Sequence, residues 1–189
     1  FIRDEVARVR SQLGKPLGTI RDREGSRELC NFLYDGIRRH RYGYETDQRT
    51  ADPQVQSIRT SKQIAAHKTA TCLDLACLFA ALLEASGQDP LIIILSAPNV
   101  SHALAGYRVR GEPRWESNSM RDLRGALVRG DAVLFETTGA VEAEQPVGAE
   151  LDRRDKLLIF EDAVSAAEAM LAHQSMKLLH FIDVGLLRK

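Results

Sequence analysis

The segment from Thr71 to Gly87 constrains the fold more than any other part of the chain. It reads TCLDLACLFAALLEASG, with apolar side chains on nearly every face of a helix. A helix that is apolar on all sides is normally buried on all sides. Thr69 or Thr71 can cap its start, and Gly87 can end it. The sequence therefore predicts a central helix that other elements must surround.

The remaining elements are expected on both sides of this helix. A continuous β-branched run at residues 91–95 predicts a central strand, after a turn at Asp89-Pro90. Ser26 and Ser61 are the expected caps of two further helices. The polar stretch 42–58 predicts a long loop. Helices are expected at 1–13, 26–41, 62–66, 71–87, 120–128 and 161–173, and strands at 91–95, 102–109, 132–136 and 178–184. Helices thus precede most strands, which is typical of an α+β fold.

Composition limits the classes of function. The chain has 189 residues, of which 44% are hydrophobic and 28% charged, so we expect a single globular domain over residues 1–189. Lys plus Arg and Asp plus Glu are both 26, which gives a formal net charge of zero. This balance provides no general attraction to nucleic acid or an anionic membrane, so we expect neither as a direct partner. Because the first residue is Phe1 and not Met, we expect a fragment of a longer protein.

The cysteines indicate a reducing compartment. The sequence has three cysteines, Cys30, Cys72 and Cys77. This number is small and odd, whereas a disulfide-rich scaffold normally has a larger, even number. We therefore expect the protein to be cytoplasmic. The sequence has neither a CxxC nor an HxxxH pair, which argues against a zinc site. We expect no metal and no organic cofactor.

Cys72 is the candidate nucleophile, because it lies in the first turn of the predicted central helix. Backbone N–H groups and the helix dipole favour a thiolate there. A free thiol is otherwise mostly protonated at neutral pH. Cys77 lies deeper in the same helix, and Cys30 lies on the apolar face of an earlier one. Both are expected to be unreactive core residues.

His102 and Glu136 can complete a catalytic set with this thiol. A thiolate nucleophile needs a base, and the base needs an orienting group. His102 lies at the start of a predicted strand, and Glu136 lies at the end of an apolar one. A carboxylate in that position can hold an imidazole on the neighbouring strand. Glu116 and Asp131 are the alternative acids.

Several motifs in this order resemble the transglutaminase-like superfamily, and more narrowly its bacterial branch, found as domains of larger and often defence-associated proteins. The resemblance covers about residues 26–184. The matching segments are Val55–Arg59, Thr71–Ala76, Leu82–Gly87, Ser101–Gly106 and Leu134–Thr138.

The resemblance implies a papain-like fold, with a nucleophile-bearing helix packed on an antiparallel sheet. It implies that Cys72 is the nucleophile, His102 the general base and Glu136 the acid that orients the base. The implied activity is that of a cysteine peptidase acting on proteins or peptides. It further implies a regulated effector domain of a bacterial defence protein, controlled by flanking domains or a regulatory partner.

Two questions stay open at this level. The Cys72 backbone N–H is a natural oxyanion donor. A second donor is Gln56, which belongs to a matching segment, or else Gln63; Gln56 is equally well explained as an exposed loop residue. The same triad also serves a transglutaminase or a deamidase, and a non-catalytic interaction domain can keep the fold.

Overall fold

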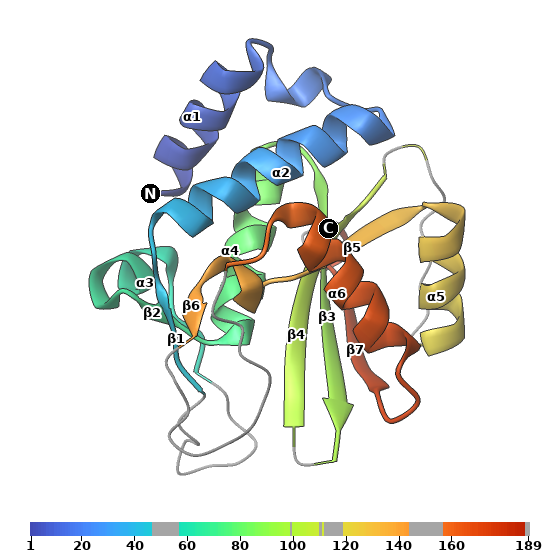
Figure 1. Ribbon diagram of the computed structural model, residues 1–189. Coiled ribbons are helices and arrows are strands. Elements are labelled where there is room, and N and C mark those ends of the chain that lie inside the picture. The colour runs from blue at the N-terminus through green and yellow to red at the C-terminus, as the bar shows by residue number, and fades with distance from the viewer. Residues whose placement is uncertain (47–56, 99, 110, 112–118, 144–156, 188–189) are drawn as a thin grey trace.

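The chain folds into helices packed on an antiparallel sheet, so the expected α+β class is confirmed (Figure 1). The computed structural model describes residues 1–46, 57–98, 100–109, 111, 119–143 and 157–187. The larger sheet has the strand order β5-β4-β3-β7. Its strands are β3 (Asp89–Ala97), β4 (Val100–Arg108), β5 (Ala132–Glu136) and β7 (Lys177–Asp183). A smaller parallel sheet has the order β2-β1-β6, formed by β1 (Gly43–Tyr44), β2 (Thr69–Ala70) and β6 (Glu142–Ala143).

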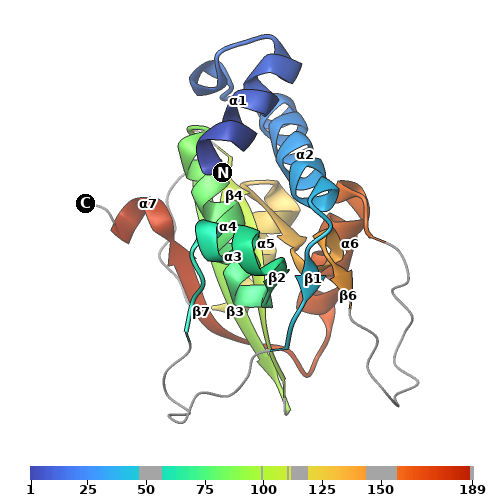
Figure 2. The ribbon, with the colours of Figure 1, turned by 90° about the vertical axis from the view of Figure 1, so that its left-hand side faces the viewer.

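The helices surround the larger sheet. Figure 1 shows α1 and α2 stacked above it, and α5 and α6 together on the right. Figure 2 shows the small sheet beside α3 and α4. The helices are α1 (Ile2–Leu13), α2 (Arg23–Arg39), α3 (Ser61–His67), α4 (Cys72–Ala85), α5 (Met120–Arg129), α6 (Phe160–Ala172) and α7 (Val184–Leu187). The described residues also form two short 3-10 turns, η1 (Leu17–Thr19) and η2 (Thr138–Ala140).

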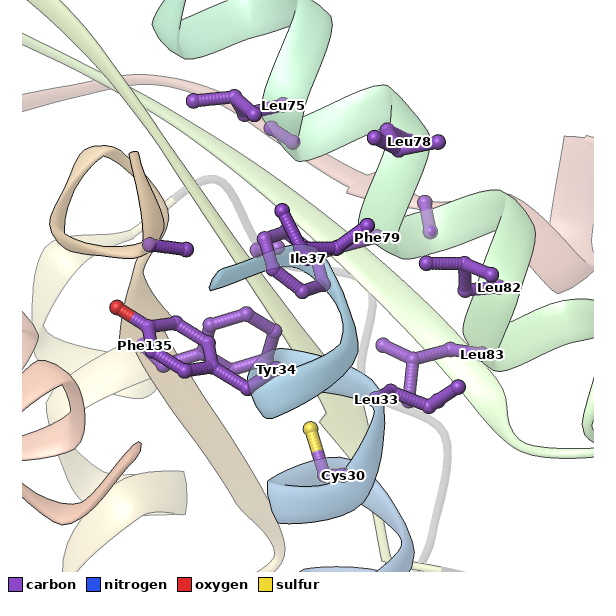
Figure 3. Close-up of a cluster of buried hydrophobic side chains, with 14 of the residues drawn as sticks. Cys30, Leu33, Tyr34, Ile37, Leu75, Leu78, Phe79, Leu82, Leu83 and Phe135 are labelled. Atoms are coloured by element: carbon purple, nitrogen blue, oxygen red, sulfur yellow. The ribbon is translucent and has the colours of Figure 1, made fainter. Parts of the chain in front are cut away.

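Helix α4 is the central helix that its apolar sequence predicts. Nine of its fourteen residues are buried. Figure 3 shows its leucines and Phe79 facing a row of α2 side chains, with Phe135 of β5 beside them. Tyr34 of α2 stacks on Phe79 with ring centroids 5.5 Å apart, and Phe135 meets Phe79 edge-on at 5.1 Å. Burying each such side chain contributes about 1.5–3 kcal/mol, so this contact fixes α4 between α2 and the sheet.

Two helix starts differ from the prediction. Helix α2 begins at Arg23, where the Asp22 side chain accepts a hydrogen bond from the Gly25 N–H at 2.7 Å, so Ser26 is not its cap. Thr60, rather than Ser61, caps α3. In both cases a neighbouring residue of similar capping strength lies further upstream, so the helix gains one or more residues. Helix α4 has the predicted Thr71 cap.

Three further differences concern strands and loops. The expected turn at Asp89-Pro90 is the start of β3; a proline is tolerated at the first residues of a strand. The expected loop 42–58 opens with a fully buried Tyr42 and the short strand β1. Residues 47–56, and with them Gln56, lie outside the described residues. Within the described ranges, no helix is both long and apolar enough to cross a membrane.

Candidate active site

The first turn of α4 presents Cys72 at the helix N-terminus. The Thr71 hydroxyl accepts a hydrogen bond from the Asp74 N–H at 3.2 Å, and the Asp74 carboxylate accepts one from the Thr71 N–H at 3.0 Å. This reciprocal capping box fixes the turn. Cys72 follows the cap directly and is partly exposed. Its thiol therefore lies where the helix dipole stabilises negative charge.

The sheet brings His102 and Glu136 together. Glu136 of β5 is paired with Leu104 of β4, so it is the diagonal cross-strand neighbour of His102. His102 Nε2 lies 3.0 Å from Glu136 Oε1. The His102 side chain keeps 15% of its surface exposed, whereas that of Glu136 keeps none. The pair is thus a buried acid that holds a base at the surface of the sheet.

Glu136 accepts further hydrogen bonds from the chain just after it. The Thr138 N–H and hydroxyl donate to Oε1 at 2.8 and 2.7 Å, and the Gly139 N–H donates to Oε2 at 2.7 Å. Burial alone raises the pKa of a carboxyl group. Here the hydrogen bonds and the charge of His102 outweigh burial, so the pKa of Glu136 lies below its usual value. The carboxylate is therefore ionised at neutral pH.

The charge on Glu136 acts on His102. Burial lowers the pKa of His102, but hydrogen bonds to the Cys72 and Glu136 side chains and their charges outweigh it. The result is a pKa raised from 6.5 to about 9. Because Glu136 engages Nε2, the ring atom that remains for Cys72 is Nδ1. The imidazole therefore lies between two groups that favour its charged form: the Glu136 carboxylate, 3.0 Å from Nε2, and the Cys72 side chain.

Two buried hydroxyl groups, those of Thr137 and Tyr34, contact the backbone of the elements that carry Cys72, His102 and Glu136. Thr137 Oγ1 lies 3.5 Å from the carbonyl oxygen of Cys72 and 3.5 Å from that of Ala103. The Tyr34 hydroxyl of α2 donates to the Glu136 carbonyl at 3.2 Å. Sequence reasoning missed these three contacts, since they join residues far apart in the chain.

The other residues considered from the sequence lie elsewhere. Asp131 pairs with Arg129 at 2.7 Å at the opposite end of β5 from Glu136. Gln63 is part of the α3 capping box, where its side-chain oxygen accepts from the Thr60 N–H at 2.8 Å. Glu116, like Gln56, lies outside the described residues.

The other two cysteines lie in less favourable surroundings. Cys30 is fully buried, and burial raises the pKa of its thiol well above the usual value. Cys77 is partly buried, and burial, together with the charge of Asp74, raises the pKa of its thiol as well. The negative charge of Glu161 acts on Cys30 and that of Asp74 on Cys77, and both disfavour a thiolate. A high pKa makes a thiol a poor nucleophile at neutral pH.

Comparison with known proteins assigns this chain to no family. No family model, no curated protein and no solved structure matches the chain. Over the described ranges, no group of three or more His, Cys, Asp or Glu side chains could hold a metal ion. The fold and the site together define an α+β protein that has a cysteine at a helix N-terminus and a histidine–glutamate pair on adjacent strands.

Proposed function

We propose that this domain is a cysteine peptidase of the transglutaminase-like superfamily with a papain-like fold, acting on peptide or protein amides. The observation that supports it most is the pairing of His102 with the buried Glu136 at 3.0 Å, together with the influence of the Cys72 side chain on the same imidazole. Its parts come from the N-terminus of a central helix and two adjacent strands. A structural cysteine needs neither a base nor an acid that orients the base. Control by flanking domains or a partner in the cytoplasm belongs to the same proposal.

The proposed reaction uses each group in turn. His102 takes the proton from Cys72, and the thiolate attacks the amide carbonyl carbon. The resulting oxyanion accepts a hydrogen bond from the Cys72 backbone N–H. His102 then gives its proton to the leaving amine, and a thioester remains on Cys72. Water attacks this thioester while His102 takes a proton from the water. The carboxylic acid is released, and the departing Cys72 thiolate recovers its proton from His102. Glu136 holds the imidazole and stabilises its charge throughout.

A peptide-library assay in ¹⁸O-labelled water tests this proposal. Each cleavage should leave a new carboxyl terminus that contains ¹⁸O. Cys72→Ala should remove nearly all product, and Cys77→Ala in the same helix should keep it. If labelled carboxyl termini also form with Cys72→Ala, cleavage does not depend on Cys72 and the proposal is contradicted. If no peptide gives a labelled carboxyl terminus, the proposal is contradicted as well. Cys72-dependent ammonia release from glutamine without backbone cleavage would instead identify a deamidase or transglutaminase.

A further inference from the structure

Arg59 connects three segments around the first turn of α4. Its backbone N–H donates to the Asp74 carboxylate at 2.7 Å. Its guanidinium group lies 2.8 Å from Glu45, just beyond β1, and donates to the Thr69 carbonyl of β2 at 3.3 Å. The same group lies 3.9 Å from Asp74. Arg59 therefore reaches the turn that holds Cys72 through both its backbone and its side chain.

Asp74 carries its charge in a buried position next to the candidate nucleophile. Its side chain is only 1% exposed, yet it lies two residues after Cys72 in the same turn. A carboxylate at this position caps the helix, but it also repels a nearby thiolate. Its negative charge already acts on Cys77 in the next turn. A buried charge needs a partner, and the guanidinium group of Arg59 lies within ion-pair distance of it.

We propose that Arg59 is a positioning residue of the Cys72 site, which neutralises the buried Asp74 carboxylate so that the capping turn presents Cys72 as a thiolate. This inference rests on the proposed function, because it assigns Arg59 a role only if Cys72 reacts as a thiolate. Asp74 then serves the cap through its hydrogen bonds, while Arg59 removes the electrostatic cost to the nucleophile.

The other charges around Cys72 leave this role open to Arg59. His102 of β4 faces the thiol directly, and Glu136 of β5 acts on it through His102. Asp74 comes from the same helix as Cys72. Glu45, just beyond β1, is itself paired with Arg59, and this pair lowers the pKa of Glu45. Among these groups, His102 stabilises the thiolate directly, and Arg59 balances the two carboxylates on its own side of the turn.

The test measures iodoacetamide alkylation of Cys72 against pH, with the labelled cysteine identified by mass spectrometry. Arg59→Gln should raise the pH of half-maximal rate by about 0.5–1 and slow alkylation at neutral pH about 3- to 10-fold. The double variant Arg59→Gln/Asp74→Asn should return the midpoint to near the wild-type value. Asp74→Asn alone should lower it, which keeps the test decisive if Arg59→Gln fails to fold.

Arg129→Gln is the matched control. Arg129 ends α5, away from Cys72, and pairs with Asp131, which is largely buried as Asp74 is. This variant should leave the alkylation profile unchanged. If the Arg59 and Asp74 variants change the melting temperature but not the pH midpoint, Arg59 is structural only and the inference is overturned while the proposed function stands. If wild-type Cys72 shows no enhanced alkylation, both are overturned.

Discussion

Replacing Glu136 by Gln removes a charge and one acceptor atom from a fully enclosed site. Oε1 accepts hydrogen bonds from His102 and from two Thr138 donors, and Oε2 accepts one from Gly139. A glutamine oxygen in place of Oε1 can keep the first three. Its NH₂ group then faces the Gly139 N–H, and two donors meet. One buried backbone N–H therefore loses its partner.

The size of the effect follows from these contacts. An unsatisfied buried donor costs about 1–3 kcal/mol, and the remaining hydrogen bonds lose their charge assistance. We expect the free energy of unfolding to fall by about 2–4 kcal/mol at neutral pH. The pKa of His102, raised from 6.5 to about 9, reflects stabilisation of the imidazolium by about 3 kcal/mol in total, at 1.36 kcal/mol per pKa unit. Cys72 and Glu136 both contribute to this stabilisation, so the loss of the Glu136 charge removes only part of it. We therefore expect alkylation of Cys72 to slow about 10- to 100-fold.

Urea unfolding and iodoacetamide kinetics at neutral pH measure the two effects separately. Asp131→Asn is the control, since it neutralises a carboxylate at the other end of β5. It should leave the alkylation rate unchanged, and because Asp131 is largely buried and bonded to Arg129, it should cost up to about 1.5–3 kcal/mol in stability. A wild-type alkylation rate in Glu136→Gln, with a strong loss in Asp131→Asn, would refute the assignment of the acid.

Two further predictions concern the base and the sheet. An NMR titration of His102 should give a pKa near 9, and Glu136→Gln should lower it. Because this pKa is raised on folding, its contribution to stability is complete below about pH 6.5 and is lost as the pH rises through about 9; a titration midpoint at or below 6.5 would contradict it. Gly106→Ala should destabilise the protein by about 3 kcal/mol in urea unfolding, because its Cβ would lie 2.3 Å from the Val133 carbonyl oxygen. Gly18→Ala, with nothing within 4 Å, is the control, and equal stability of the two variants would show that β4 and β5 can separate there.

Strong local patterns explain how much of the fold could be predicted. The all-round apolar sequence of α4 predicts its central position, and the run 91–95 predicts β3 without its full length. Ser26 and Asp22 are caps of similar strength, so the start of α2 depends on which turn the rest of the protein stabilises. Strand β1 has two residues, too few to show a period, and its pairing with β2 and β6 is long-range.

In the candidate site too, local sequence patterns predict some features, and long-range contacts determine the others. The type and order of Cys72, His102 and Glu136 are visible in the sequence, because Cys72 begins α4 and Glu136 ends β5 as expected, while His102 lies two residues inside β4. The hydrogen bonds that hold them are less visible. Arg59 and Asp74 are fifteen residues apart, and the Thr137 hydroxyl contacts two other segments. Such contacts depend on tertiary packing, which local periodicity does not encode.

The most direct test of the central claim is the rate at which each cysteine reacts with iodoacetamide between pH 6 and 9, measured by mass spectrometry in the wild type and in His102→Ala. Cys72 should be labelled first, about tenfold or more ahead of Cys30 and Cys77, because it alone has a base beside a helix N-terminus. His102→Ala should remove that advantage at neutral pH. First labelling of Cys30 or Cys77, or a Cys72 rate indifferent to His102→Ala, would contradict the account.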